Sequence, residues 1–583
     1  MTENLFDINV KVAGQGGDGS LTTISLLGNA LARRGFHLYS TRNVASRIRG
    51  GHAAALLRGS IEPRTGMGDN IDVLVAFDAE AIEIGGYRVA PHGFVIYDSS
   101  AGPLPNGFLP EGATVIEIPF GRLAVRDLRR ELFKNSLTFG VISRILSLGD
   151  DEAASVLEAR FGGRPKLIDK NLQALREGFK LASSSGFEED SGPLRLARVE
   201  ADERVFISGN HAAAIGFLAA GVRFFAGYPI TPATEVLEVM NRHMEAFGGV
   251  SVQAEDELAA VNMALGASLT GVRSLVATSG PGISLMQEGI GHAGAAEIPL
   301  VIIDAQRAGP STGMPTKPEQ SDIGMIIHGG TGDFPRIVLA PGNPSDAFEL
   351  AVKAANLAQR IQGPVYLMLD QSVSQDSATT APFDISGVEI DQGARLSQEQ
   401  LDALDEYRRY KVTADGLSPL AVPGMAGGMS LVTGNEHDEW GKVSTNPVNR
   451  IAMMDKRARK VDTIKDSLPS GLRFGHDTSP IGIVGIGMES GVIREAVERL
   501  TVAGIALAGL QPRTVWPVPA DTLEFVASKE RVYVVEHNHE AQLIQVLASV
   551  GAPFNTLRSI RKFDGVAFTP GELVDHIATA EAE

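Results

Sequence analysis

The stretch VSVQAEDELAAVNMALGASLTGVRSLVATSGPG, from Val250 to Gly282, contains a short apolar strand, an alanine-rich helix, a second strand and a glycine turn. Three acids, Glu255, Asp256 and Glu257, stand where the first strand gives way to the helix. Acids in the first turn of a helix offset its dipole and cap free N–H groups. Capping therefore explains these acids on spacing alone, and the rest of the chain must show whether one of them does chemistry.

The same alternation continues on both sides of this stretch. VFISGN begins at Val205, VRFFAGYPITP follows a helical segment, and IPLVIIDAQR and PVYLMLDQ extend the pattern to about Asp370. Short apolar strands that alternate with helices are typical of a parallel, doubly wound sheet, whose ligand lies beyond the carboxyl ends of the strands. Four candidate side chains stand at or just after predicted strand ends: Tyr228, Glu257, Ser279 and Arg307.

Two further segments show an α/β pattern. INVKVAG, GQGGDGS and a helical run follow one another near the amino terminus, and SPIGIVGIGMESG opens a similar unit near the carboxyl terminus. The sequence therefore predicts an α/β protein with three α/β domains. The predicted boundaries are residues 1–190, a linker at 191–204, a central domain at 205–385, an irregular connecting segment at 386–475 and a final domain at 476–583.

Composition excludes several classes of function. A net charge of −18 argues against nucleic acid or an anionic membrane as the main partner. The chain has no cysteine, so no disulfide, thiolate nucleophile or cysteine-held iron–sulfur cluster can reside in it. The start lacks a secretory signal pattern, and no uncharged apolar run approaches about 18 residues. We expect a cytoplasmic protein.

GQGGDGS nearly fits a dinucleotide-binding fingerprint, with Gly14, Gly16 and Gly19 at the three glycine places. That fingerprint also requires an acid at the end of a second strand about 20 residues on, where HLYSTRN stands instead. Tight packing between strand and helix is the simpler interpretation, although the backbone N–H groups could cradle a phosphate.

Asp18 and Asn43 have the spacing by which thiamine-dependent enzymes hold magnesium and pyrophosphate. The residues before Asn43, HLYSTR, are polar and include Arg42, which makes a poor buried strand beside a cation site. Coincidence is therefore the favoured interpretation, and no metal ligand is assigned in this chain.

Three loops of the central segment suit an anionic ligand. In GYPITPAT two prolines fix the backbone around Thr231 at a helix start. ATSGPGISLM is a strand-to-helix turn, and QRAGPSTGMPTKPEQSD gathers an arginine, a lysine and hydroxyl residues behind a strand. Each alone could be a solvated loop, but their order on one predicted sheet favours a shared site.

These motifs resemble those of the 2-oxoacid:ferredoxin oxidoreductases, thiamine-diphosphate enzymes that cleave 2-oxoacids to acyl-CoA and carbon dioxide. GYPITP, EDELAAVNMALGAS, ATSGPGISLM and QRAGPSTGMPTKPEQSD resemble the pyrimidine-binding α chain of the family, and TGNEHDEWG with RIAMMDKRARK resembles its 2-oxoglutarate-type version. The GQGGDGS domain, with NVASRIRGGHA after it, resembles the γ subunit fused ahead of α. The final segment resembles the transketolase-like domain.

The resemblance implies a partner. The chain lacks a credible magnesium–pyrophosphate motif and any cysteine, and in the family both lie on a separate β subunit. Thiamine diphosphate would be shared with that subunit, which would carry Mg²⁺ and a [4Fe–4S] cluster in a heterotetramer of two α–β pairs. The implied reaction converts 2-oxoglutarate and coenzyme A to succinyl-CoA and carbon dioxide, reversibly, with ferredoxin taking the electrons. Alternatives are pyruvate or a branched-chain or aryl 2-oxoacid as substrate, or a non-catalytic scaffold.

The resemblance also implies roles for single residues. If both are helical, Glu255 and Glu257 lie about 200° apart and cannot serve one point. Family spacing favours Glu257 as the carboxylate that bonds the cofactor's aminopyrimidine, with Glu255 as the fallback and Asp256 as a cap. The other implied cofactor contacts are Tyr228, Pro229, Ile230, Ser279 and Gly280. The implied substrate contacts are Thr231, Arg307, Thr316 and, for a distal carboxylate, Lys317. Gly16 and Gly17 would lie near the phosphates of coenzyme A.

Overall fold

The computed structural model describes residues 4–44, 51–163, 165–188 and 192–582. The middle of the NVASRIRGGHA motif and the start of the predicted linker lie outside the described residues. The chain forms two compact units. We call the first, which comprises residues 1–206, 376–381 and 569–572, the amino-terminal unit, and we call the remainder the main unit.

The amino-terminal unit is built on a mixed sheet of eight strands, in the order β7-β6-β5-β2-β4-β3-β16-β9. β5, β6 and β7 extend the sheet in parallel from β2, whereas β4, β3 and β16 continue it antiparallel. Its strands are β2 (Asp7–Gln15), β3 (His37–Val44), β4 (His52–Ser60), β5 (Ile71–Ala76), β6 (Val89–Asp98), β7 (Thr114–Ile118), β9 (Val205–Ser208) and β16 (Ser377–Thr380). β16 comes from far along the chain, and its Ser377 lies opposite Ser40 of β3.

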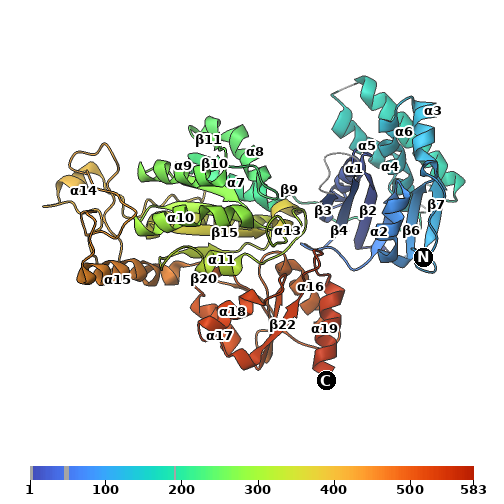
Figure 1. Cartoon of the computed structure of the whole chain (residues 1–583). Coiled ribbons are helices and arrows are strands. Elements are labelled where there is room, and N and C mark those ends of the chain that lie inside the picture. The colour runs from blue at the N-terminus through green and yellow to red at the C-terminus, as the bar shows by residue number, and fades with distance from the viewer. Residues whose placement is uncertain (1–3, 45–50, 164, 189–191, 583) are drawn as a thin grey trace. The chain divides into compact units, whose positions relative to one another are not determined.

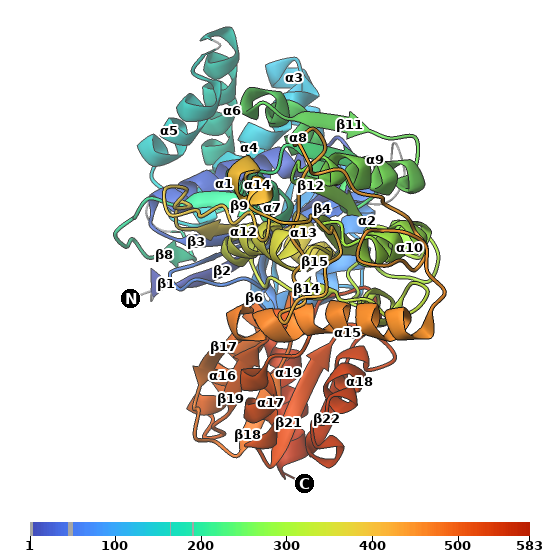
Figure 2. The same cartoon turned by 90° about the vertical axis from the view of Figure 1, so that its left-hand side faces the viewer.

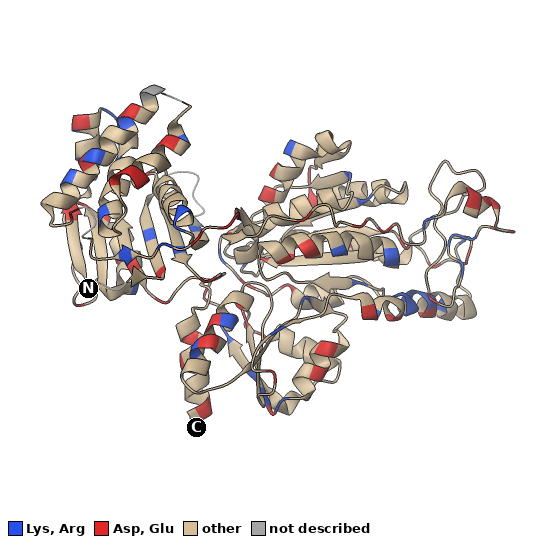
Figure 3. Ribbon diagram, turned by 180° about the vertical axis from the view of Figure 1, so that it is seen from behind, with Lys and Arg blue, Asp and Glu red and all other residues tan. Residues whose placement is uncertain are grey.

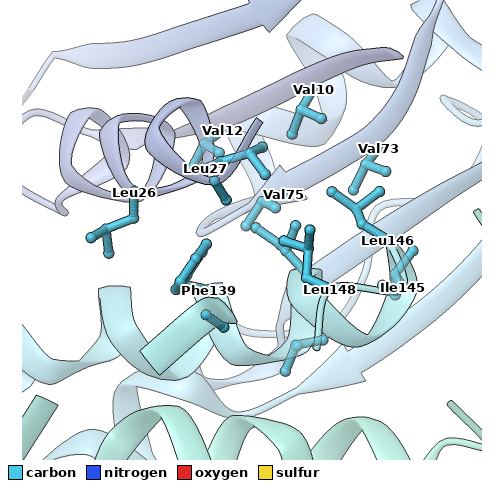
Figure 4. Close-up of a cluster of buried hydrophobic side chains, with 14 of the residues drawn as sticks. Val10, Val12, Leu26, Leu27, Val73, Val75, Phe139, Ile145, Leu146 and Leu148 are labelled. Atoms are coloured by element: carbon cyan, nitrogen blue, oxygen red, sulfur yellow. The ribbon is translucent and has the colours of Figure 1, made fainter. Parts of the chain in front are cut away.

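A continuous apolar core holds this unit together. Its helices are α1 (Ser20–Arg33), α2 (Ala79–Gly85), α3 (Phe120–Leu128), α4 (Lys134–Ile145), α5 (Asp150–Phe161) and α6 (Pro165–Ser184). Figure 4 shows Val10 and Val12 of β2 packed beside Val75 of β5, with Leu27 of α1 and Phe139 of α4 covering them. Each such side chain contributes about 1.5–3 kcal/mol when it is fully buried.

The main unit contains a central sheet of seven strands, in the order β11-β10-β12-β13-β15-β14-β20. Figure 1 labels β10, β11, β15 and β20 of this sheet. The first six are parallel, and β20 pairs antiparallel with β14 at the edge. The strands are β10 (Phe224–Gly227), β11 (Val250–Gln253), β12 (Ser274–Thr278), β13 (Leu300–Gln306), β14 (Ile337–Leu339), β15 (Pro364–Asp370) and β20 (Thr514–Trp516).

Helices cover both faces of the central sheet. Leu275, Val301 and Leu367 point into one apolar cluster with α7 (Gly209–Ala219), α8 (Thr234–His243) and α12 (Pro344–Ile361). Val276 and Ile302, the next residues along two of these strands, point into a second cluster with α9 (Glu257–Leu269), α10 (Gly280–Ala295) and α11 (Ile323–His328). The prediction of an α/β protein with a doubly wound parallel sheet is confirmed.

The order of the strands creates a switch point. β10 pairs with β11 on one side and with β12 on the other. The connection after β10 therefore runs toward one edge of the sheet, and the connection after β12 runs toward the other edge. In open α/β sheets the crevice at such a point, outside the carboxyl ends of the strands, is the usual ligand site. GYPITP follows β10 and the Ser279 turn follows β12.

The connecting segment forms two helices, α14 (Gln398–Asp402) and α15 (Pro447–Ile464), among irregular stretches. Figure 2 shows α15 side-on, and Figure 3 shows basic positions along it. Two of these, Lys456 and Lys460, are fully buried against Glu297. A buried ion cluster thus anchors this segment to the central domain.

The last segment forms a five-stranded sheet, in the order β17-β19-β18-β21-β22. Its elements are β17 (Leu472–Gly475), β18 (Ile481–Val484), β19 (Ala508–Gln511), β21 (Arg531–Glu536), β22 (Leu557–Arg561), α16 (Glu489–Val502), α17 (Ala520–Ala527), α18 (Gln542–Ser549) and α19 (Pro570–Ala582). Across the described part of the chain, no helix combines the length and the apolar character that a membrane span requires.

Candidate active site

Glu257 begins α9, directly beside the switch point. Its side chain is 6% exposed, whereas Glu255 is exposed and Asp256 is the N-cap, whose Oδ1 accepts a hydrogen bond of 2.7 Å from Ala259 N. A β-carbon at position 282 would lie 2.9 Å from Glu257 Oε1, so the glycine lets α10 approach this carboxylate. Among the described residues nothing donates a hydrogen bond to it or pairs with it.

Ser279 occupies the N-cap position of α10 and is fully buried. Its Oγ has no hydrogen-bond partner within the described residues. A β-carbon on the neighbouring Gly280 would lie 2.6 Å from the Asp322 carboxylate, so Asp322 packs closely against the backbone of this turn. A buried hydroxyl without a partner costs about 1–3 kcal/mol, which a polar ligand would recover.

The GYPITP loop leaves the end of β10 with Tyr228 and Pro229 exposed. Ile230 packs against the core cluster on the α7 side, and the following Thr231–Pro232 peptide is cis. Two backbone carbonyls of the loop are held from outside it. Arg307 Nη1 donates to the carbonyl of Thr231 over 2.8 Å, and Asn210 Nδ2 donates to the carbonyl of Pro232 over 2.9 Å.

Arg307 follows β13 and is 7% exposed. Burial lowers the pKa of its guanidinium, and the nearby Asp322 opposes that shift. Nη1 is used by Thr231, while Nε is buried with no hydrogen-bond partner among the described residues. Because a guanidinium presents its donors in a planar fork, the remaining donors suit a carboxylate.

A cavity of about 390 Å³ opens beside Arg307 and Gly280, and Glu257, Ser279 and Thr231 are not part of its wall. The carboxyl-terminal segment contributes part of its wall, through Asn538, His539, Glu540 and Gln542. The central domain contributes Gly280, Pro281, Ser284, Arg307, Gly309, Pro310, Ser311, Glu319, Ser321, Asp322 and Met325. Arg307, Gly280 and the loop after β13 thus lie together, and the grouping of Arg307 with Tyr228, Glu257 and Ser279 in one site stays a prediction.

Thr316 and Lys317 lie further along the same loop and are half-buried. Neither belongs to the wall of this cavity. A β-carbon at Gly565 would lie 3.1 Å from Lys317 Cβ, so the lysine lies beside a turn of the final domain. Burial lowers the pKa of its ammonium, and Asp564 opposes that shift.

The GQGGDGS turn lies in the amino-terminal unit between β2 and α1. Gly16 and Gly17 are exposed, and Gly17 has a φ of 104°, which favours glycine. Asp18 turns back toward the protein: its carboxylate accepts a hydrogen bond from Gln15 N and lies 3.6 Å from Lys134 Nζ.

Sequence reasoning missed several residues at the site. Asp304 is fully buried in β13, and Asp322 lies on the cavity wall. Burial raises the pKa of both carboxyls, that of Asp322 to about 7. A charged residue inside the apolar run LVIIDAQ was the available signal for Asp304. The cavity residues of HNHE, 537–540, gave none, because they come from another domain.

Comparison with known proteins covers most of the chain. The family model "Pyruvate flavodoxin/ferredoxin oxidoreductase, thiamine diP-bdg" matches residues 215–456. "Pyruvate ferredoxin/flavodoxin oxidoreductase" matches residues 9–181, and "Pyruvate:ferredoxin oxidoreductase core domain II" matches residues 480–573.

Relatives and a solved structure agree with these matches. A 2-oxoacid:ferredoxin oxidoreductase subunit alpha from Sulfolobus sp is 32% identical over 96% of this chain and 95% of its own length. The 2-oxoglutarate synthase subunit KorA of Methanothermobacter thermautotrophicus is 33% identical over 64% of this chain and 98% of its own length. The structure of 2-oxoglutarate:ferredoxin oxidoreductase from Magnetococcus marinus, with 2-oxoglutarate, coenzyme A and succinyl-CoA bound, is similar with a TM-score of 0.92 and 34% identity, covering 99% of this chain and 100% of that one.

Proposed function

Because this chain belongs to the 2-oxoacid:ferredoxin oxidoreductase family, we propose that it is the α subunit, fused to a γ-like domain, of an enzyme acting on 2-oxoglutarate. The enzyme would convert 2-oxoglutarate and coenzyme A to succinyl-CoA and carbon dioxide, reversibly, and pass two electrons to ferredoxin. The Magnetococcus marinus enzyme, which matches nearly the whole chain, supports this choice of substrate.

One observation carries the proposal: Glu257 is a buried residue, and its carboxylate has no described partner, at the switch point of the sheet. The aminopyrimidine ring of thiamine diphosphate offers a ring nitrogen that can share a proton with such a group. Glu257 would hold that proton, and neither exposed Glu255 nor the cap Asp256 could replace it.

The neighbouring groups fit the same cofactor. Ser279 Oγ has no hydrogen-bond partner within the described residues and is available to a polar ligand, and α10 approaches Glu257 closely at Gly282. When bound, thiamine diphosphate would supply the nucleophilic carbon that attacks the 2-oxo carbon and the electron sink for decarboxylation. Ser279, Gly280 and the Tyr228–Ile230 backbone would position it and exclude water.

The substrate would be held by Arg307 and its surroundings. The unused donors of Arg307 would grip the carboxylate next to the oxo group, and its bond to the Thr231 carbonyl would fix the direction of the guanidinium. The Thr231 hydroxyl would form a hydrogen bond with the substrate near the same carboxylate, and Thr316 would help to hold that carboxylate. Lys317 lies outside the cavity wall, so its proposed contact with the distal carboxylate requires the loop to carry it inward.

The proposal requires a β subunit that brings Mg²⁺, the pyrophosphate site and a [4Fe–4S] cluster, in a heterotetramer. The chain has no cysteine of its own for a cluster. Leu258 and Met263 of α9 and Leu285 of α10 are about half exposed on the two helices that flank Glu257. Exposed apolar side chains around a buried functional acid support an interface at this place.

The glycine turn of the amino-terminal unit is the proposed contact for coenzyme A. Gly16 and Gly17 are exposed at the start of α1, and a β-carbon at Gly17 would touch nothing within 4 Å. Open backbone N–H groups at a helix start suit a phosphate.

The first experiment isolates the native complex and measures iron, acid-labile sulfide and thiamine diphosphate in it. We expect all three to accompany a second polypeptide. The complex is then assayed on 2-oxoglutarate, pyruvate, and branched-chain and aryl 2-oxoacids. Preference for pyruvate would contradict the proposed substrate, and full activity from this chain alone would contradict the two-subunit proposal.

A second experiment tests the distal carboxylate. Lys317→Met should raise KM for 2-oxoglutarate while leaving KM for 2-oxobutyrate, which has no distal carboxylate, unchanged. Equal effects on both substrates would remove Lys317 from the substrate site.

A third experiment tests the interface. Leu258→Asp should weaken association with the β subunit by about 2 kcal/mol, roughly 30-fold in Kd. Val502→Asp, a matched change at a 91% exposed residue of α16, should leave association unchanged. Equal loss in both variants would contradict an interface at α9.

A further inference from the structure

Two carboxyl groups of the central domain are not used by the proposed chemistry. Asp304 lies in β13 and is fully buried, and neither of its oxygens has a hydrogen-bond partner among the described residues. Asp322 lies just before α11, and its Oδ2 is likewise buried without a partner there. Three of the four carboxyl oxygens of these two acids are thus buried without a hydrogen-bond partner in the described part of the chain.

Asp322 is fixed in place at the wall of the cavity. Its backbone N–H donates to Gln306 Oε1 over 3.1 Å, and its carboxyl group is pressed against Gly280. Gln306 stands two residues after Asp304 on the same strand, so both side chains leave the same face of the sheet. Asp322 and Arg307 both line the cavity, and Asp304 lies on the face of β13 from which Gln306 reaches Asp322.

The charges around the pair favour retention of a proton. Burial raises the pKa of Asp304 well above its usual range, and the nearby Asp322 raises it further. Burial also raises the pKa of Asp322 to about 7; Glu319 on the same loop adds to that shift and Arg307 opposes it. His539 and Glu540 face the cavity from the final domain. Two neighbouring acids in a poorly hydrated site cannot both ionise readily.

Arg307 links this pair to the substrate. Asp322 is the carboxyl group that acts electrostatically on the guanidinium, whose Nη1 is committed to Thr231 and whose Nε has no described partner. An ionised Asp322 would attract the same donors that an incoming carboxylate needs. A protonated Asp322 leaves them available.

We propose that Asp304 and Asp322 are positioning residues whose protonation keeps Arg307 available for the carboxylate of the 2-oxoacid. This inference rests on the proposed role of Arg307 in substrate binding. It assigns the pair control over the affinity for substrate and over the dependence of that affinity on pH. The 2-oxoacid carboxylate itself stays ionised throughout the neutral range.

Binding is measured by calorimetry on the complete complex, with 2-hydroxyglutarate as the probe because it has both carboxylates and no oxo carbon. If the probe binds only when Asp322 is protonated, Kd rises about tenfold between pH 6 and pH 8. Asp322→Asn should bind as tightly at pH 8 as the natural protein binds at pH 6, with a flat profile. A profile for Asp322→Asn like that of the natural protein would overturn the proposal.

Two further variants identify the titrating group. Glu319→Gln should move the midpoint of the profile to lower pH, because it removes a negative charge that raises the pKa of Asp322. It also tests the proposal if Asp322→Asn does not fold, and an unchanged midpoint would contradict it. His539→Gln should keep the tenfold dependence; loss of the dependence in that variant would assign it to the imidazole instead.

The retained proton has its own signature. Infrared spectra of the natural complex at pH 8 should contain the carbonyl band of a protonated carboxylic acid that is absent from Asp304→Asn. Identical spectra would overturn the proton-holding role of Asp304. Arg307→Gln separates the two proposals: unchanged probe binding would refute the role of Arg307 in substrate binding, whereas lost binding together with an unaltered Asp322→Asn profile would refute only the pair.

Discussion

Two buried acidic clusters stand close together in the sequence and have opposite surroundings. Glu297 is fully buried, with Lys456 Nζ and Lys460 Nζ each 2.5 Å from one of its oxygens. Arg409 Nη2 donates to the Glu297 backbone carbonyl over 2.6 Å. Asp304, seven residues later, is equally buried and has no cation or donor against it in the described structure. We call the first cluster closed, because lysines of the same chain pair with Glu297, and we call Asp304 with Asp322 the open cluster, because no described cation pairs with Asp304.

The difference shows how the role of a buried acid follows from its partners. The lysines hold the pKa of Glu297 well below its usual range, so its contribution to stability is present above the unfolded pKa of about 4.3 and is lost as pH falls. Burial raises the pKa of Asp304, so its contribution is present at low pH and is lost as pH rises through the range above about 3.9. A buried acid that is paired with cations stabilises the fold, and a buried acid without a partner is available for ligands and protons.

The largest effect should come from opening the closed cluster. Glu297→Gln leaves two buried lysines without their counter-charge and should reduce the free energy of unfolding by about 3–5 kcal/mol, measured by chemical denaturation. Glu349→Gln is the control, because its ion pair with Arg513 is half exposed and should be worth less than about 1 kcal/mol. Equal effects would erase the distinction between the clusters.

A second prediction concerns the unpartnered acid at the switch point. Glu257→Gln should lower kcat by about 10²–10³-fold in the complete complex, because it removes a proton-holding group. The denaturation midpoint and assembly should stay unchanged, since no described group is left without a partner. Glu255→Gln should keep normal turnover. Loss in the Glu255 variant alone would shift the assignment by two residues, and normal activity in both would favour a scaffold.

A third prediction tests the open cluster through its pH dependence. Between pH 5 and pH 6 the natural protein should lose stability from Asp304, by at most about 1.4 kcal/mol, because its folded state retains a proton that the unfolded state has released. Asp304→Asn should lack that loss. Denaturation curves at the two pH values measure it, with exposed Asp405→Asn as the control. Parallel losses in the natural protein and Asp304→Asn would contradict a raised pKa.

The smallest effect should come from the acid that serves only as a cap. Asp256→Ala should cost about 1 kcal/mol of stability, because the hydrogen bond to Ala259 N is lost. Asp256→Asn should preserve it, since an amide oxygen caps equally well. Thermal denaturation distinguishes the two, and a similar loss in both variants would mean that charge rather than capping matters.

Much of the central site could be predicted because its residues depend on local pattern. The period of apolar residues gave the strands, and the parallel sheet then gathered the residues after their ends at one edge. The predicted difference between Glu255 and Glu257 agrees with the structure, but for another reason: Glu255 precedes the N-cap and is exposed, whereas Glu257 begins α9 and is buried. The cap function of Asp256 is confirmed.

The rest depended on contacts that no local pattern records. His539 and Gln542 reach the cavity from a domain more than two hundred residues further along the chain. In the sequence, Lys456 and Lys460 of α15 are typical of a solvent-exposed segment, so the sequence predicts an irregular connecting segment. In the structure both lysines are buried by their pairing with Glu297. The predicted domain boundaries and the individual site assignments stay predictions.

The pairing of β16 with β3 has a consequence for how the chain is made. On the ribosome, β3 emerges early but gains its neighbour only after residue 380 has been synthesised. Until then the nascent amino-terminal sheet presents β3 as an edge with unpaired backbone groups. A gene split at the predicted linker would have to supply this strand from a separate polypeptide, so the fused chain replaces a bimolecular encounter with a tethered one.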